Sequence, residues 1–172
     1  YLVHSMAAGE HSFEEKDRLG ASNAAMAAAK TDVRRIIYLG GLGQRTSDLS
    51  AHLRSRNEVG DILRRGPVPV TEFRAAMVIG SGSLSFEMMH ALVNRLPVMT
   101  APKWVSTRSQ PISIRDVLRY LVECLAEPAS VGKVIDIGGP DVLTYRDMML
   151  RFAGILGLRR WIIVVPVLTP RL

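Results

Sequence analysis

Apolar residues follow two different spacings along this chain of 172 residues. Short apolar runs, several of which end in glycine, predict buried strands, while apolar residues three or four positions apart predict amphipathic helices. The predicted strands lie at residues 1–3, 34–41, 68–80, 132–140 and 161–168, the last being either a strand or a docking segment. The predicted helices lie at about 13–30, 47–65, 84–95, 115–125 and 144–157.

The ends of two predicted helices carry capping residues. Ser47 or Asp48 is placed to cap the second helix, and Gly66-Pro67 ends it because proline cannot continue a helix. Thr144 is placed to cap the last helix, and Gly157 lies near its end. These signals fix the helix boundaries independently of the apolar spacing.

The alternation of strands and helices predicts an α/β fold, with a parallel sheet, right-handed crossovers and helices on both faces. Ligands bind such folds beyond the carboxyl ends of the strands. The predicted site therefore comprises the segments that follow strands: His4–Ser5, Gly40–Leu42, Gly80–Ser83 and the loop around Gly138. The length of the chain predicts a single domain.

Composition excludes several kinds of site and partner. The single cysteine, Cys124, excludes an internal disulfide and a cysteine-based zinc site, and it favours a reducing compartment such as the cytoplasm. No apolar run is long enough for a membrane-spanning helix. The net charge is +6, but the arginines are scattered in pairs without interleaved aromatic residues, which disfavours nucleic-acid binding. The four histidines have no metal-ligand spacing, so no metal is expected.

Two glycine-rich segments would allow a phosphate to approach the backbone closely. The segment "GGLG" at 40–43 follows a predicted strand but lacks the GxGxxG spacing, so a tight turn is an equal interpretation. The segment "VIGSGSLSFE" at 78–87 imitates the dinucleotide fingerprint, with Ser85 where the third glycine belongs. No ribose-binding acid follows it at about 20 residues. Each segment alone is a weak indication of a dinucleotide site.

The segment "HLRSR" at 52–56 raises the main chemical question. His52 and Arg56 are four residues apart and therefore share one face of the predicted helix. They form either a catalytic pair or part of a partly exposed basic helix face, and the sequence leaves both interpretations open.

Four segments, in order, resemble the extended and atypical short-chain dehydrogenase/reductases. The stretch "DRLGASNAAMAAAKTDVRRIIYLGG" is similar to the family's helix and fifth strand, and "FRAAMVIG" resembles its Arg-Pro-x-x-Val-Tyr-Gly segment, with Arg74 on the arginine. The stretch "QPISIRDVLRYLVECL" resembles the helix after the substrate region, and "GKVIDIGGPDVLTYRDMM" resembles the late strand with its continuation. The nearest subgroup is the NmrA-like, NAD(P)H-binding and epimerase-like one.

The resemblance implies a Rossmann-like fold that binds NAD or NADP, with NADP(H) favoured. The family's catalytic Tyr-x-x-x-Lys motif falls on "HLRSR", which puts His52 at the tyrosine position and Arg56 at the lysine position. The family's catalytic serine falls near Gly40 and Gly41, which have no hydroxyl. Arg56 retains the positive charge that holds a ribose or phosphate, and His52 is a residue type able to shuttle a proton. The implied cofactor-binding residues are His4, Ser5, Gly40, Gly41, Leu42, Arg56, Arg74, Ala75, Ala76 and Met77.

The resemblance begins at the family's fourth strand. It implies a single-domain fragment that lacks the first three strands and the glycine turn that holds the pyrophosphate, so that the full cofactor site would not be present. Residues 1–80 would form the C-terminal part of the Rossmann core, and residues 81–172 the substrate lid and C-terminal region. Residues 1–3 would form an open sheet edge through which copies of the chain could associate.

Two functions therefore remain open. One is an NAD(P)-dependent oxidoreductase or sugar-nucleotide epimerase-like enzyme with a substituted Tyr-x-x-x-Lys site and an unknown small-molecule substrate. The other is a non-catalytic dinucleotide sensor or assembly factor. The first function is the leading interpretation. The altered catalytic positions support the second, and the intact order of segments does not separate the two.

Overall fold

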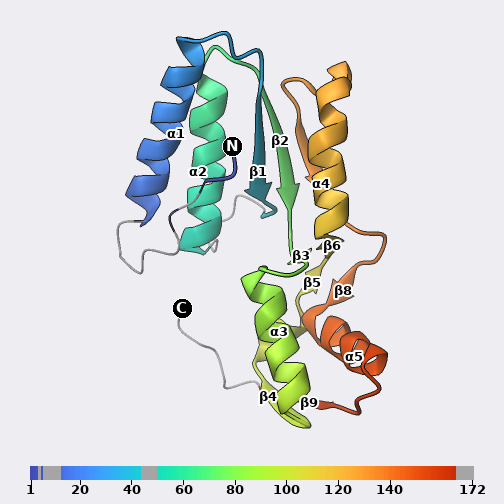
Figure 1. Cartoon of the computed structure of the whole chain (residues 1–172). Helices are drawn as coiled ribbons and strands as arrows, with labels where there is room; N and C mark the ends of the chain where they lie inside the picture. Colours follow the sequence, from blue (N-terminus) through green and yellow to red (C-terminus); the bar gives the residue numbers. More distant parts are fainter. Residues whose placement is uncertain (4, 6–12, 44–49, 166–172) are drawn as a thin grey trace. The chain divides into compact units, whose positions relative to one another are not determined.

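The computed structural model describes residues 1–3, 5, 13–43 and 50–165 (Figure 1). The chain forms two compact units, and each of them is discontinuous in sequence. Unit 1 consists of Tyr1–Ala76 and Leu118–Ile137, and unit 2 consists of Met77–Val117 and the chain from Gly138 onward. The chain therefore leaves unit 1, returns to it once, and leaves it again.

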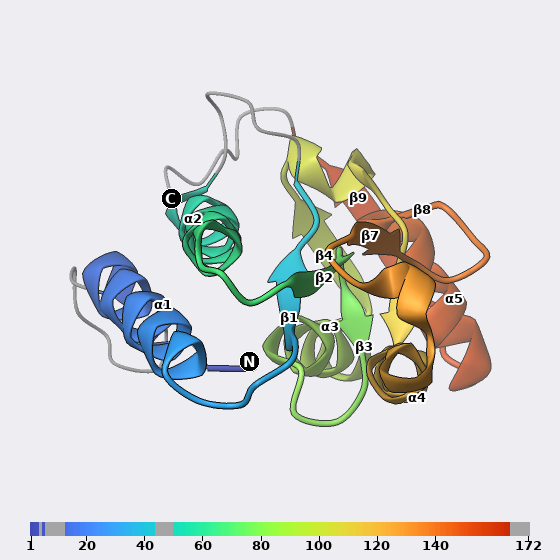
Figure 2. The same cartoon turned by 90° about the horizontal axis from the view of Figure 1, so that it is seen from above.

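Unit 1 is built around a three-stranded parallel sheet in the order β1-β2-β7. Its strands are β1 (Ile36–Gly41), β2 (Val70–Ala75) and β7 (Val134–Ile137), and its helices are α1 (Phe13–Ala29), α2 (Ala51–Arg65), the larger part of α4 (Ile114–Glu123), and the short 3-10 turns Cys124–Ala126 and Pro128–Ser130. Helices α1 and α2 cover one face of the sheet and α4 the other (Figures 1 and 2). The predicted α/β fold with a parallel sheet and helices on both faces is confirmed.

The two faces of β2 pack against different helices because successive side chains of a strand alternate in direction. Val70 joins the buried cluster beneath α1 and α2, which also contains Ala21, Tyr38, Val59 and Leu63. Phe73 points to the other face, where its ring lies 5.9 Å from that of Tyr120 on α4. The small side chains of α1 allow that helix to pack closely on α2.

Unit 2 contains short strand pairs instead of one larger sheet. Its elements are β3 (Val78–Ile79), α3 (Leu84–Arg95), β4 (Val98–Ala101), a 3-10 turn (Lys103–Ser106), β5 (Arg108–Ser109), β6 (Ile112–Ser113), β8 (Leu143–Thr144), α5 (Tyr145–Ile155) and β9 (Trp161–Val164). Strands β3 and β6 pair in parallel, as do β4 and β9, while β5 and β8 pair antiparallel. Its core consists of two apolar clusters, one around Met77, Met89 and Val93 and the other around Met99 and Val105.

Most of the predicted boundaries are confirmed within a few residues. Helix α3 spans the predicted residues, and α5 begins after Thr144, whose side chain takes part in a full capping box with Asp147. Helix α2 ends at Gly66 as predicted, but Ser50 caps its start. The predicted caps Ser47 and Asp48 lie outside the described residues.

The prediction of a strand at residues 1–3 is wrong. Leu2 and Val3 are 61% and 64% exposed, and neither pairs with a neighbouring strand. Only Tyr1 reaches β1, where its backbone nitrogen donates to the carbonyl oxygen of Ile37 at 2.5 Å. A single ladder bond cannot hold a strand in place. Association of copies through this edge remains a prediction.

The predicted strand at 68–80 is divided in two. Strand β2 ends at Ala75 and β3 begins at Val78, because the chain passes from unit 1 to unit 2 between them. The family resemblance implied a division of the chain at residue 80 into a part of the Rossmann core and a substrate-lid region. This division by function differs from the two compact units of the structure, and it remains a prediction. Among the described residues, no helix has both the length and the apolar character needed to cross a membrane.

Candidate functional site

The glycine pair predicted to follow a strand lies inside the strand, as the last two residues of β1. A Cβ atom at Gly40 would lie 3.1 Å from Cε1 of Tyr38 and 3.2 Å from Oε1 of Glu72. Both distances are shorter than ordinary van der Waals contact. The sheet ladder continues one residue further, since the Leu42 amide donates to the Ala75 carbonyl at 2.8 Å. Packing against Tyr38 and Glu72 is therefore one reason for glycine at position 40.

Helix α2 packs against β1 at Gly41. A Cβ atom there would lie 2.8 Å from Cδ2 of Leu53 and 3.9 Å from both Cβ and Cγ of Arg56. The stem of Arg56 therefore lies beside the last residue of β1. Because β1 belongs to a parallel sheet, this is the end of the strand at which ligands bind in such folds.

His52 lies one turn before Arg56, in the first turn of α2. The spacing of His52, Arg56, Val59 and Leu63 puts all four on one face of the helix, and the last two are buried in the core of unit 1. The Ser50 side chain accepts a hydrogen bond from the Leu53 amide at 3.3 Å and so fixes the start of the helix. The helix thus presents His52 and Arg56 on its sheet-facing side. The catalytic role of both residues remains a prediction.

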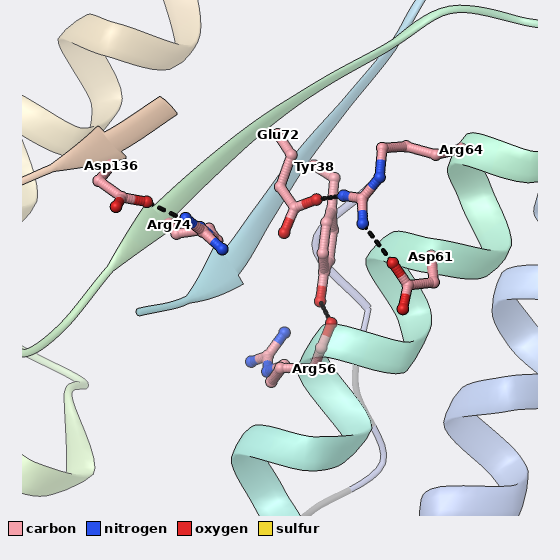
Figure 3. Close-up of polar contacts among 7 residues, drawn as sticks. All are labelled: Tyr38, Arg56, Asp61, Arg64, Glu72, Arg74 and Asp136. Atoms are coloured by element: carbon pink, nitrogen blue, oxygen red, sulfur yellow. Dashed lines mark hydrogen bonds and ion pairs between the residues drawn. The ribbon is translucent and has the colours of Figure 1, made fainter. Parts of the chain in front are cut away.

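Arg74 lies on the middle strand, in register with Gly40. Its Nε atom donates to Oδ1 of Asp136 on β7 at 2.7 Å, as Figure 3 shows. Both side chains of this ion pair are partly exposed, so the pair contributes little to stability. An incoming anion can therefore compete with Asp136 for the Arg74 guanidinium at small cost.

The other residues predicted to bind cofactor differ in their surroundings. Ala75 is buried and Ala76 is exposed, while Met77 is the first residue of unit 2 and belongs to its core. The backbone amide of Ser5 donates to Oδ1 of Asp17 at 2.7 Å. His4 lies outside the described residues. Their binding roles also remain predictions.

Two phenol groups surround the Arg56 turn. The hydroxyl of Tyr38 is buried and donates to the carbonyl oxygen of Arg56 at 3.0 Å (Figure 3). Burial raises the pKa of Tyr38, and the positive charge of Arg56 partly offsets this effect. Burial and the Asp17 carboxylate likewise raise the pKa of the Tyr1 phenol, which Arg56 lowers. Both phenols therefore remain protonated at neutral pH and able to donate.

Asp17 and Ser55 form a buried hydrogen bond that the sequence interpretation missed. The Ser55 hydroxyl on α2 donates to Oδ2 of Asp17 on α1 at 2.9 Å, and both residues are at least 95% buried. The other carboxylate oxygen of Asp17 accepts from the Ser5 amide. One carboxylate thus ties two helices and the preceding chain segment together. The only sequence signal was a serine inside "HLRSR", and nothing marked its partner.

A second buried carboxylate, Glu72, lies between α2 and the sheet. It forms an ion pair with Arg64, whose other terminal nitrogen donates to Oδ1 of Asp61 at 2.5 Å (Figure 3). Gly60 leaves room for it, since a Cβ atom there would lie 2.7 Å from Oε2 of Glu72. A glutamate on the core side of a central strand was not predicted, because the alternation in "VTEFRA" does not distinguish it from a solvent-facing position.

The segment at 78–87 does not form an open phosphate site at the start of α3. Gly82 adopts a φ of 82°, and its amide already donates to Oε1 of Glu87 at 3.2 Å. A carboxylate at this helix start opposes the binding of an anion. Within the described part of the chain, no group of three or more His, Cys, Asp or Glu side chains could hold a metal ion.

No family model matches the chain. One curated protein is similar: the mitochondrial NADH dehydrogenase [ubiquinone] 1 alpha subcomplex subunit 9 of Arabidopsis thaliana. It is 26% identical over 139 residues, which cover 80% of this chain and 35% of that protein. The chain therefore spans about a third of this relative.

Solved structures of similar fold include enzymes that act on nucleotide sugars. The UDP-glucuronic acid 4-epimerase of Bacillus cereus, in complex with NAD, matches with a TM-score of 0.73 and 15% identity, over 90% of this chain and 57% of that one. WbmH of Bordetella bronchiseptica, in complex with NAD+, matches with a TM-score of 0.69 and 17% identity, over the same two shares. A dTDP-4-dehydrorhamnose reductase of Clostridium acetobutylicum matches with a TM-score of 0.69 and 16% identity, over 89% and 60%.

These likenesses confirm the resemblance predicted from the sequence at the level of the fold. The chain has a Rossmann-type architecture like that of these three proteins and spans less than two thirds of each. Its activity and ligands are matters for proposal, because identities this low establish the fold alone.

Proposed function

We propose that this chain, which has the fold of the extended short-chain dehydrogenase/reductases, binds a nicotinamide dinucleotide at the carboxyl ends of β1 and β2. The observation that carries the proposal is the position of the Arg56 stem, 3.9 Å from a Cβ atom built at Gly41. Arg74, in register with Gly40, adds a second cation beside the same two glycines. Two solved relatives of this fold bind NAD.

Within this site each residue has a chemical role. Gly40, Gly41 and Leu42 would face the nicotinamide, since they lie at the carboxyl end of β1, where such folds bind ligands. Arg56 would hold the ribose or a phosphate through its planar guanidinium. Arg74, Ala75 and Ala76 would line the nicotinamide side. The set contains donors for both NAD and NADP, and a direct comparison of the two ligands decides between them.

If the protein is an enzyme, His52 would move the proton that accompanies hydride transfer. A bound dinucleotide would supply or accept the hydride. His52, on the same face of α2 as Arg56, would deliver a proton to the carbonyl oxygen or remove one from the alcohol. The substrate would be a small carbonyl, alcohol or nucleotide sugar, in line with the enzymes of similar fold.

Binding is tested by fluorescence titration of the chain with NADH and NADPH. We expect Arg56→Ala to weaken binding at least tenfold, because it removes the cation beside Gly41. Arg54→Ala is the matched control: Arg54 lies on the same helix, and with respect to the described residues its one ion pair is an exposed one with Glu14 at 3.7 Å. Equal loss in the two variants would mean that the cofactor responds only to overall positive charge, and the proposed site would be wrong.

A second candidate function is a non-catalytic dinucleotide-binding subunit or assembly factor. The packing at Gly40 favours it, since a serine there would place its Cβ against Tyr38 and Glu72. A serine with the catalytic hydroxyl of the family would therefore require Tyr38 or Glu72 to shift slightly. The similarity to an alpha subcomplex subunit of mitochondrial NADH dehydrogenase supports the same function.

Steady-state oxidation of NADH and NADPH over a panel of carbonyl compounds separates the two functions. An enzyme would show turnover that His52→Ala abolishes and His90→Ala preserves, because His90 lies on α3 against aromatic rings of unit 2. Cofactor binding without turnover in the unaltered chain would favour the non-catalytic function.

A further inference from the structure

The turn of α2 that carries Arg56 is held by two buried side chains from other elements. Ser55, 2% exposed, donates its hydroxyl to Asp17 on α1 at 2.9 Å. Tyr38, fully buried on β1, donates its hydroxyl to the Arg56 carbonyl at 3.0 Å. Adjacent residues of one helical turn are therefore tied to both the neighbouring helix and the sheet.

The Arg56 carbonyl does not need the Tyr38 hydroxyl as a hydrogen-bond donor. It already has a place in the α2 ladder, because a helical carbonyl accepts from the amide four residues later. Phenylalanine at position 38 would fill the same space without a buried hydroxyl. Burial of the Asp17 carboxylate is costly unless it is hydrogen-bonded, as it is here by Ser55 and Ser5. Directional bonds in this position restrict the register of α2 on β1.

A fixed register of α2 on β1 limits the positions that the Arg56 side chain can take. A free arginine side chain has many rotamers, and ordering it on binding has an entropic cost. Among the described residues no carboxylate forms an ion pair with Arg56, in contrast to Arg18, Arg64 and Arg74. Its stem packs beside Gly41, and its charge lowers the pKa values of the Tyr1 and Tyr38 phenols. In the described part of the chain, the stem of Arg56 is therefore packed in place while no acid pairs with its charge.

We infer that Asp17, Ser55 and Tyr38 are positioning residues that hold Arg56 ready for an anionic ligand, the ribose-phosphate portion of the dinucleotide. This inference rests on the proposed function of Arg56. The three residues do not touch the ligand; they act through the backbone of the Ser55–Arg56 turn. They order the Arg56 side chain when the protein folds, so that ligand binding does not include this entropic cost.

The first test is a double-mutant cycle on ligand affinity. Tyr38→Phe and Ser55→Ala are each expected to raise the dissociation constant for NADH about threefold to tenfold. In the Arg56→Ala background the same changes should have no further effect. Thr71→Val is the control, because it removes another buried hydroxyl hydrogen bond of unit 1, to the Ser130 carbonyl at 2.8 Å. Equal effects in the two backgrounds, or an effect of the control as large as those of the variants, would overturn the inference.

The second test needs no ligand and separates failure of the inference from failure of the proposed function. The heteronuclear NOE of the Arg56 Nε–H group reports the order of that side chain in the free protein. We expect a high value in the unaltered chain and in Thr71→Val, and a lower value in Ser55→Ala, Tyr38→Phe and Asp17→Asn. If the order of Arg56 does not fall in any of the three, the residues are not positioning residues, whatever the chain binds. If the order falls but the unaltered chain binds no dinucleotide, the proposed function fails and the positioning of Arg56 stands.

Discussion

The two units differ in the kind of side chain that they bury. All of the buried polar or charged residues in the described part of the chain belong to unit 1: Asp17, Ser55, Thr71, Glu72 and Ser130. Unit 2 buries apolar side chains, among them four methionines, Met77, Met89, Met99 and Met148. Hydrogen bonds between buried groups fix distance and direction, whereas methionine adapts to irregular space. Unit 1 is therefore built for fixed geometry, and its candidate site depends on it.

The largest expected effect comes from breaking the buried ion pair of unit 1. Arg64→Met leaves the Glu72 carboxylate buried without its cation and is expected to lower the free energy of unfolding by about 3 kcal/mol or more. The double variant Arg64→Met/Glu72→Leu removes both charges and should recover most of the loss. Urea unfolding followed by far-UV circular dichroism measures both. A double variant as unstable as the single one would show that the packing of Arg64 matters more than its charge.

Replacing one helical glycine in each unit by alanine compares the packing of the two units directly. Gly60→Ala in unit 1 would place a methyl group against the Glu72 carboxylate, and we expect a loss of about 1 to 3 kcal/mol. Gly154→Ala in unit 2 meets no heavy atom within 4 Å and should gain about 0.5 to 1 kcal/mol from helix propensity. Hydrogen exchange of peptides from each unit shows in which unit the stability has changed. Stabilisation by both substitutions would refute the close packing at Gly60.

Replacement of core side chains by others of similar volume should separate the units more finely. Thr71→Val removes the buried hydrogen bond to the Ser130 carbonyl, and we expect a loss of about 1 to 2 kcal/mol. Met148→Leu in unit 2 should cost less than about 1 kcal/mol because no directional contact is lost. Both tryptophans, Trp104 and Trp161, lie in unit 2, so tryptophan fluorescence follows that unit alone. Equal losses of stability would mean that the two cores tolerate substitution by side chains of similar volume equally well.

The smallest expected effect is a pH dependence of unit 2. The Thr144 hydroxyl and, to a lesser extent, its amide hydrogen-bond Asp147 and hold the pKa of that carboxyl below its usual value. A lowered pKa in the folded state means stability that is present above the ordinary aspartate pKa of about 4 and is lost as pH falls through the lower folded value. Thermal unfolding followed by tryptophan fluorescence should show this loss in the unaltered chain. Asp147→Asn should lack it, and an identical acid response would exclude the capping box as its source.

The sequence predicted the elements well because their signals are local. Helix α3 and the cap at Thr144 follow from apolar spacing and from residues a few positions apart. The strand at residues 1–3 was predicted from a short apolar run and from the family resemblance, but a strand also requires a partner along its length. Only Tyr1 reaches β1, so the prediction failed where the decisive contact is distant in sequence.

The candidate site was predictable only in part for the same reason. The spacing of His52 and Arg56 puts them on one helix face, and their family resemblance pointed to the end of β1. The supporting contacts join residues far apart in the chain, Ser55 with Asp17 and Arg64 with Glu72. No local pattern distinguishes a buried aspartate on an alanine-rich helix from an exposed one. The reason for glycine at position 40 likewise became visible only from its neighbours.

The discontinuity of unit 1 has a consequence for how the protein is made. Strand β7 pairs with β2 at Glu72 and Val134, although the whole of Met77–Val117 lies between them in the chain. At ordinary rates of translation, β2 waits roughly 3 to 12 seconds for its neighbour to leave the ribosome. During that interval the unpaired amides and carbonyls at its edge can pair with a strand of another chain. Charged side chains discourage such encounters, and Glu72 and Arg74 lie on this edge of the nascent sheet.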